Sequence, residues 1–466
     1  MPRSLLDPGA TALQRIRRHA IAWAPSESAL AVAALRVAVV GMMLVTNEPR
    51  EALQSVLIHA SSMPPEGLGF IARHAPTSAA FYSGVRVVYY SSAALSLIGV
   101  YTRVALAALL ASAFVLFGLA QLAGAVLHDM HLLWFLGLLL SSRTGDALSI
   151  DEWFRTTPGD AFSRRLLGSD EGTAAFGWTL FFARTLLGVI YFFPGLWKLR
   201  ESGLAWALSD NLAHQMHAKW FEFGIVPSPR IDRAPGVMHA FGLCTIAFEL
   251  GFLALVHIGP RTRLALAAWG LAFHWGIEHF MRIPFSSLWI AYVVLVPWKC
   301  SRPSRLAPGG AGLVTVVGVG LVLANTIQGL RGQTQSYPFA CYPTFQWIAP
   351  ATLVDLELRA LLEDGASRRI PHGRDASGKR TQSEWGTVWS VAGVYGPPFS
   401  VERLGRYIAA ERRRGAVERA LAGAYGVRAQ LVWWRTDPEA WGEPPVRAQE
   451  LAVVPLSKHP EEAGAR

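Results

Sequence analysis

Long apolar stretches separated by short polar connections fill the first two thirds of the chain. Residues 104–127, for example, contain no charged side chain, and about 20 consecutive apolar residues let a helix cross a bilayer. We expect apolar helical segments at about residues 29–45, 86–101, 104–127, 131–142, 176–197, 237–258, 264–281, 285–298 and 309–328. Because residues 131–142 are short for a span, the pattern predicts an all-α polytopic membrane helical bundle of about 8–9 spans over residues 29–330.

Some of these segments carry a charged side chain, which is costly inside a bilayer. The charged residues are Arg36, Arg184, Glu249 and Glu278. Ionisable groups in membrane helices almost always face protein or a water-filled cavity, where neighbours can neutralise them. We therefore expect these side chains to face the interior of the bundle.

The pattern changes at about residue 350. Apolar and polar residues alternate in VDLELRALLEDGASRRIP around Asp364-Gly365, which predicts a β-hairpin. SVERLGRYIAAERRR and AVERALAGAY have the spacing of amphipathic helices, HGRDASGKRTQSEWG reads as a loop, and VRAQLVWWRT reads as a final strand. Residues 350–466 are thus predicted to form a small extramembrane α+β domain.

Two connections contain local signals of their own. Within residues 198–236, an apolar set recurs at roughly helical spacing, which suits a helix lying in the membrane interface. The set is Trp206, Leu212, Met216, Trp220 and Phe223. Within residues 143–173, Ser149 followed by Glu152 resembles a box that starts a helix.

Composition agrees with a membrane protein. Of 466 residues, 52% are hydrophobic and 16% are charged, and the mean hydropathy is +0.29, so a soluble fold would struggle to cover its surface. The net charge of +10 comes from Arg and Lys beside the apolar runs and in the C-terminal region. Basic residues that flank spans are a topology signal, so a nucleic-acid partner is not expected.

The basic residues also suggest an orientation. Residues 1–28 form a basic amphipathic lead-in to the first span. With the N-terminus on the cytoplasmic side, the inner loops contain ten Lys and Arg residues, before the N-terminal segment is counted, and the outer loops contain eight. Nine spans then place residues 350–466 on the outer side. The three cysteines, Cys244, Cys300 and Cys341, form no CxxC pair and no metal-ligand spacing, so neither a disulfide framework nor a metal site is expected.

Lys198 ends the apolar run TLFFARTLLGVIYFFPGLWK, in which Arg184 is the only other charged residue. Burial disfavours an ammonium, so a lysine with one apolar flank can lose its proton and act as a base. The alternative is that Lys198 snorkels to the interface, as lysines at helix ends usually do.

Further candidates lie in the apolar segments or in the connections between them. They are His131, His274, Glu278, His279, Arg184, Glu249 and the pair His214/His217. His274 and Glu278 are four residues apart and so share one helix face. HWGIEH does not match the HExxH zinc pattern, and for each histidine a packed, hydrogen-bonded role is the alternative.

Several stretches, in order, resemble a known family. RTLLGVIYFFPGLWKL contains an arginine, a YF-x-x-G run and a lysine, and LAFHWGIEHFMRIPFSSLWIAYVVL contains an FH-G…F segment. The earlier stretches are LIGVYTRVAL, LHDMHLLWFLGLLL and GDALSIDEW. Together they are similar to the vitamin K-dependent gamma-carboxylase-like, or HTTM (horizontally transferred transmembrane), family over roughly residues 25–300.

The resemblance implies roles for particular residues. In the animal carboxylases a lysine deprotonates vitamin K hydroquinone, and Lys198 matches it by the motif. His131 matches a histidine that assists the reaction, and His274 matches the FH histidine of the family. Further candidate quinone contacts are Arg184, Tyr191, Trp197 and Glu278. Aromatic residues such as these more often pack or lie at the membrane interface.

The resemblance therefore implies an integral-membrane carboxylase of the lyase class that uses a reduced quinone (vitamin K or menaquinone-like), O₂ and CO₂. Its partners would be membrane lipid, an isoprenoid quinone and an exported protein or peptide substrate. However, the region after residue 350 is much shorter than the lumenal region of the carboxylases, and nothing in it resembles their pro-peptide site.

A membrane protein without catalysis remains the alternative, either binding quinone or lipid or helping to assemble an exported partner. A solute transporter is not favoured, because no inverted repeat is visible.

Overall fold

The computed structural model describes most of the chain. The described residues are 27–46, 52–59, 65–123, 129–156, 159, 161–168, 171–298, 302–303, 311–334, 336–340, 345–372, 388–393, 398–413 and 417–456. Almost all of the predicted basic segment 1–28, the predicted loop after His372, Cys300 and Cys341 lie outside these residues.

Each predicted apolar segment coincides with a helix. These are α2 (Ala29–Thr46), α5 (Ala79–Ile98), α6 (Thr102–Ala120), α7 (Met130–Leu140), α10 (Ala174–Ser202), α13 (Pro235–Leu255), α14 (Pro260–Met281), α15 (Ser286–Trp289) with η4 (Ile290–Leu295), and α16 (Ala311–Arg331). Among the described residues, four helices are long and apolar enough to cross a membrane: α6, α10, α13 and α16. The chain is therefore mostly helical, and these helices indicate a membrane protein.

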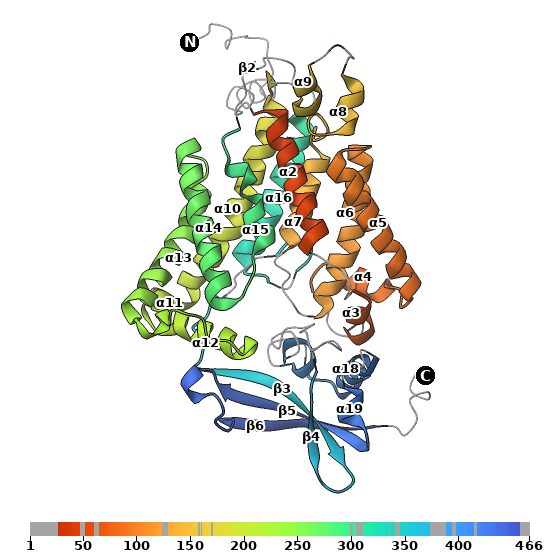
Figure 1. The fold of residues 1–466 in the computed structure, drawn as a ribbon, viewed down its shortest axis with the longest axis vertical. Helices are drawn as coiled ribbons and strands as arrows, with labels where there is room; N and C mark the ends of the chain where they lie inside the picture. The colour runs from red at the N-terminus through yellow and green to blue at the C-terminus, as the bar shows by residue number, and fades with distance from the viewer. Residues whose placement is uncertain are drawn as a thin grey trace.

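The long helix α10 is the centre of the bundle. The side chain of its N-cap, Thr173, accepts a hydrogen bond from the backbone N–H of Phe176. Along its length α10 packs against α13, α16, α2, α7 and η4. Figure 1 shows α13 and α14 on one side of it and α5 and α6 on the other. Both apolar and charged residues of α10 are thereby buried between other helices.

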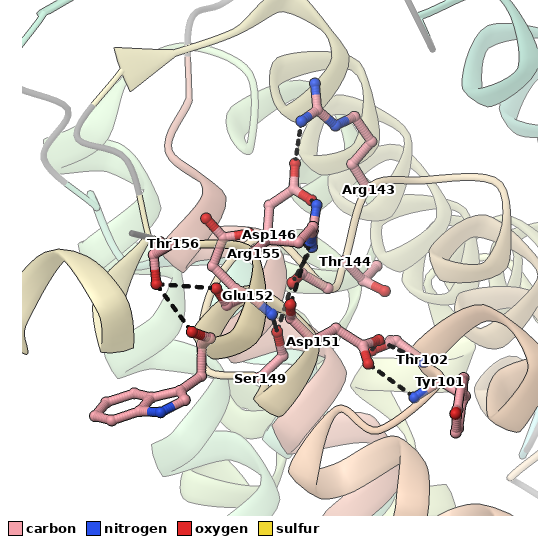
Figure 2. A network of polar contacts seen from close by, with 12 residues as sticks. Tyr101, Thr102, Arg143, Thr144, Asp146, Ser149, Asp151, Glu152, Arg155 and Thr156 are labelled. Carbon is pink, nitrogen blue, oxygen red and sulfur yellow. Dashed lines mark hydrogen bonds and ion pairs between the residues drawn. The ribbon is translucent and has the colours of Figure 1, made fainter. Parts of the chain in front are cut away.

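The connection between α7 and α10 has its own polar network (Figure 2). Ser149 caps α8 (Ile150–Arg155) by accepting from the backbone N–H of Glu152 at 3.0 Å, which confirms the predicted helix-start box. Asp151 accepts from the backbone N–H groups of Tyr101 and Thr102 and from the Thr102 hydroxyl, at 2.7 to 2.9 Å. A single carboxylate thus accepts from two of the backbone N–H groups that the start of α6 leaves without a helical partner.

Three of the four charged residues expected in the bundle interior are indeed buried: Arg36, Arg184 and Glu249. Arg36 is fully buried and donates to the carbonyl oxygens of Thr144 and Leu148. The expectation was wrong for Glu278, which is exposed. Of the residues of α14, Leu266, Gly270, His274 and Met281 are buried, so most of this helix, including Glu278, faces away from the bundle interior.

Shorter helices link the long ones. They are α3 (Ala52–His59), α4 (Gly69–His74), α9 (Phe162–Leu167), α11 (Ala205–Leu208) and α12 (Asn211–Phe223). The predicted interfacial helix corresponds to α11 and α12. Trp206, Met216 and Trp220 are buried on it, Leu212 is partly buried, and Phe223 is exposed. In Figure 1, α12 lies across the end of the bundle, between the long helices and the C-terminal sheet.

The C-terminal region forms a four-stranded antiparallel sheet in the order β4-β3-β5-β6. The strands are β3 (Thr352–Leu362), β4 (Ser367–Ile370), β5 (Ala424–Arg435) and β6 (Arg447–Pro455), and α18 (Val401–Arg413) packs with them. Strands β3 and β4 form the predicted hairpin, with Gly365 at φ +83° in its turn.

Two details of this region differ from the prediction. The helix expected over AVERALAGAY is a single turn, α19 (Glu418–Leu421), because Gly423 takes a left-handed φ of +74° and β5 starts at Ala424. β5 is also not the final strand. β6 follows it at the edge of the sheet, mostly exposed, and so has no clear alternation of buried and exposed positions.

The sheet and the start of α2 lie at opposite ends of the bundle (Figure 1). The backbone of Glu27, two residues before α2, pairs with Thr173 at the start of α10. At the far end, Phe221 of α12 contacts the rings of Trp434 and Trp441 in the sheet region. α10 therefore runs from the N-terminal end of the bundle to the end that faces the C-terminal sheet.

Candidate functional site

Lys198 lies near the sheet-facing end of α10, where this helix and α13 come unusually close. Gly195, one turn earlier, makes the approach feasible. A Cβ at this position would lie 2.9 Å from the Cβ of Glu249 and 3.2 Å from the backbone N of Leu250. The absence of a side chain at residue 195 thus lets α13 bring Glu249 up to Lys198.

Lys198 and Glu249 form a buried ion pair. The Lys198 Nζ donates to both carboxylate oxygens, at 2.7 Å to Oε1 and 2.8 Å to Oε2. The two side chains are only 3% and 7% exposed, and the Nζ lies 5.0 Å from the centre of the Trp206 ring. Lys198 is therefore held within the protein. The alternative interpretation required its side chain to snorkel to the surface, which it does not do.

A second polar group lies on the adjoining helices. The Tyr191 hydroxyl is 2.6 Å from His274 Nε2 and 2.5 Å from the Tyr292 hydroxyl, and all three side chains are buried. Tyr292 can reach this position because Gly270 of α14 has no side chain, since a Cβ there would lie 2.1 Å from the Tyr292 hydroxyl oxygen. Within the described residues, His274 Nδ1 is buried without a hydrogen-bond partner.

Members of both polar groups line one cavity of about 90 Å³. Lys198, Glu249, Tyr191 and His274 supply polar atoms, while most of the wall is apolar. A single water needs only about 10–15 Å³ on this scale, so the space is enough for several waters or for part of a flat ring. Apolar walls with a few converging polar groups are typical of small-molecule sites.

The ends of other segments close the cavity. Trp206 of α11 and Phe345, which precedes β3, both line it. The Trp206 Nε1 donates to the Phe345 carbonyl at 2.5 Å, and the Ser202 hydroxyl donates to the Gln346 carbonyl at 3.0 Å. The chain that leads into the C-terminal sheet is thus tied to the wall of the cavity.

The remaining predicted catalytic residue, His131, does not line this cavity. It is buried in α7, and its Nε2 lies 2.9 Å from the carbonyl oxygen of Ser287. The neighbouring Leu288 is part of the cavity wall. The structure thus brings Lys198 and His274 to one cavity and places His131 behind that wall.

Of the candidate quinone contacts, only Tyr191 lines the cavity. Trp197 donates from its Nε1 to the Gly329 carbonyl at 2.8 Å and packs on α16. Arg184 lies toward the other end of the bundle and pairs with Glu27 at 2.8 Å. Glu278 is exposed. These three contact other helices or the surface, not the cavity.

The sequence named Glu249 as a candidate but gave it no role, and it did not single out Tyr292. Glu249 gave the same signal as Lys198, an ionisable residue within an apolar run, but the pairing between them was not visible. Tyr292 gave no separate signal, because an aromatic residue in an apolar segment usually packs. Among the residues that the structure describes, no group of three His, Cys, Asp or Glu side chains could hold a metal ion.

The histidine-rich connection outside the spans has a different organisation. His217 Nε2 lies 3.0 Å from Asp232, which also accepts two hydrogen bonds from Arg230. Burial raises the pKa of Asp232, but hydrogen bonds from Arg230 and His217 outweigh it and lower the pKa to about 2. His217 therefore belongs to a largely buried polar network and is not part of the cavity wall.

Comparisons of the chain with protein families, curated proteins and solved structures found no match. The cavity between α10, α13 and α14, with its buried Lys198–Glu249 pair, is thus the feature from which a function can be argued.

Proposed function

We propose that this chain is an integral-membrane enzyme that resembles the vitamin K-dependent gamma-carboxylases and uses Lys198 as a base on a lipid-soluble quinol. One observation carries the proposal: a buried lysine–carboxylate pair faces an apolar cavity that also contains His274. An apolar cavity beside candidate spans suits a ligand that arrives from the lipid phase, and the lysine offers it a proton acceptor.

The ion pair supplies a route to a neutral amine. Transfer of one proton over 2.7 Å, from Lys198 Nζ to Glu249, leaves an uncharged amine and an uncharged acid. Burial lowers the cost of this neutral arrangement relative to the ion pair, because desolvation penalises both charges. The amine then accepts a proton from the quinol hydroxyl, and Trp206 helps to exclude water.

His274 is suited to bind and orient the quinol that Lys198 deprotonates. Its Nε2 is occupied by Tyr191, and its Nδ1 has no partner within the described residues. A buried ring nitrogen without a partner is costly, and an oxygen of a bound quinol would satisfy it. Tyr191 and Tyr292 fix the orientation of the ring. Oxidation of the quinol by O₂ would supply a strong base for carbon deprotonation, and CO₂ would trap the resulting carbanion.

A non-catalytic role is the second candidate, because Glu249 binds Lys198 through both oxygens and neutralises its charge without a ligand. In that role the cavity binds quinone or lipid without turnover, or the chain helps to assemble an exported partner through its C-terminal sheet.

The proposed topology has eight or nine spans, with the N-terminus cytoplasmic and residues 350–466 outside. It is supported by the shorter apolar helices at residues 29–45, 130–140 and 286–295, and by the position of the sheet at the end of the bundle opposite Glu27. Single cysteines at Ser4 and Asp364, in a chain without its native cysteines, test it with an impermeant thiol reagent. Labelling of both from the same side would refute the topology.

The catalytic proposal is tested with Lys198→Arg. Arginine can keep the ion pair with Glu249 but stays protonated at any working pH. The matched control is Lys219→Arg, because Lys219 forms a similar 2.7 Å pair with Glu222 on α12, outside the cavity. Purified protein in lipid would be given a menaquinol with O₂ and CO₂, and quinol consumption would be measured.

We expect Lys198→Arg to abolish consumption at equal folded abundance, and Lys219→Arg to leave it unchanged. A wild-type rate in Lys198→Arg would refute the base assignment. If wild-type protein shows no turnover but co-purifies with an isoprenoid quinone, the binding role is the better account.

A further inference from the structure

A second buried charge cluster lies at the opposite end of the bundle from the cavity. It consists of Glu27, Arg184 of α10 and Arg263 in the first turn of α14. The connection between α13 and α14 lies at this end, away from the C-terminal sheet (Figure 1). Because α10 and α13 are candidate spans, this level corresponds to a membrane interface.

Among the described residues, the cluster contains two guanidinium groups and one carboxylate, so its positive charge exceeds its negative charge. Glu27 Oε1 lies 2.8 Å from Arg184 but 3.7 Å from Arg263. Arg184 also donates from its Nε to the Val294 carbonyl at 2.8 Å. Two guanidinium groups, each permanently charged, thus share a single acid.

Arg263 is the poorly paired member. Its side chain is only 14% exposed. Within the described part of the chain, its Nε is buried without a hydrogen-bond partner. A charge withdrawn from water without a close counter-ion is strongly disfavoured. The arrangement therefore calls for an additional anion at the exposed edge of Arg263.

We propose that Arg184 and Arg263 bind the phosphate group of an anionic phospholipid, with Glu27 as a built-in competitor for the same guanidinium groups. Guanidinium groups match phosphate oxygens in geometry and charge. Basic pockets between membrane helices on the cytoplasmic side are suited to acidic head groups. The N-terminus of α14 adds a favourable dipole at the same place.

The test compares thermal unfolding midpoints in nanodiscs made of phosphatidylcholine alone and of phosphatidylcholine with phosphatidylglycerol. Wild-type protein should unfold at a higher temperature in the phosphatidylglycerol discs. Arg263→Gln should lose most of this shift. Arg261→Gln, which removes an exposed charge two residues away, should keep it. Equal losses in the two variants would show general surface electrostatics and overturn the site.

Glu27→Gln gives a prediction of opposite sign. Removal of the competing carboxylate should enlarge the stabilisation by phosphatidylglycerol, because both guanidinium groups then depend on the lipid. A smaller shift than in wild-type protein would overturn the proposal. Inorganic phosphate added to phosphatidylcholine discs separates the two sources of the anion. A shift that Arg263→Gln abolishes would support the anion site but overturn its assignment to lipid.

Discussion

The Lys198–Glu249 pair makes a strong quantitative prediction. At an effective dielectric constant of about 20, unit charges separated by the observed 2.7 Å attract each other by about 6 kcal/mol. Desolvation of both ions offsets most of this attraction. The intact pair therefore contributes little net stability, whereas a single remaining ion keeps its desolvation cost and loses the attraction.

The cost of each single substitution can be bounded. At pH 7 an ordinary lysine amine costs about 5 kcal/mol to deprotonate, and an ordinary glutamate costs about 4 kcal/mol to protonate. If one partner is removed, the remaining group can become neutral by losing or gaining a proton. The free energy of that proton transfer is therefore an upper limit on the cost of burying the unpaired group. Lys198→Met and Glu249→Leu should therefore each destabilise the fold by about 3–5 kcal/mol.

The double variant should behave differently, because it buries no charge. Lys198→Met with Glu249→Leu is expected to lie within about 1 kcal/mol of the wild type, which gives a coupling energy of several kcal/mol. The control cycle uses Arg435→Met and Glu443→Leu, whose side chains are 60% and 51% exposed. Its coupling should be at most about 1 kcal/mol.

Reversible unfolding in mixed detergent micelles, followed by tryptophan fluorescence, would give the free energies of unfolding for both cycles. The reasoning fails if the single substitutions at Lys198 and Glu249 each cost less than about 1 kcal/mol, or if their costs simply add in the double variant.

Three further predictions concern packing, pH and capping. Gly195→Ala forces its Cβ against Glu249 and should cost about 1–3 kcal/mol in the same unfolding assay, whereas Gly276→Ala, which meets open space, should not destabilise the fold; equal effects would contradict this. Burial lowers the pKa of His372 from 6.5 to about 4, so its stabilising contribution is complete above pH 6.5 and is lost as the pH falls toward 4, by at most about 3 kcal/mol. Between pH 4 and pH 6.5 the melting temperature should depend less on pH in His372→Gln than in the wild type. An unchanged pH dependence would exclude this residue as the cause. Asp151→Ala removes three hydrogen bonds at the start of α6 and should cost about 1–3 kcal/mol, with hydrogen exchange increasing first at that helix end and not elsewhere.

The sequence by itself determined the helical elements and the hairpin. The apolar runs gave the position of each long helix because a buried or membrane helix is specified by its own composition over about 20 residues. The helix start at Ser149 and the turn at Gly365 were also readable, since a cap and a left-handed turn depend on a few adjacent residues. The single-turn α19 and the edge strand β6 were not predicted, because a short apolar pattern fits more than one structure.

Only the tertiary structure decided which polar groups meet. Sequence reasoning singled out Lys198 and His274, because ionisable groups in apolar runs are costly wherever they finally lie. Their partners are 51 residues away for Lys198 and 83 for His274. These pairings depend on how α10, α13 and α14 pack, and that packing is set by glycine contacts such as Gly195 on Glu249. No local pattern encodes the register of one helix against another. The sequence therefore indicated which ionisable residues are costly to bury, but not which residues neutralise them.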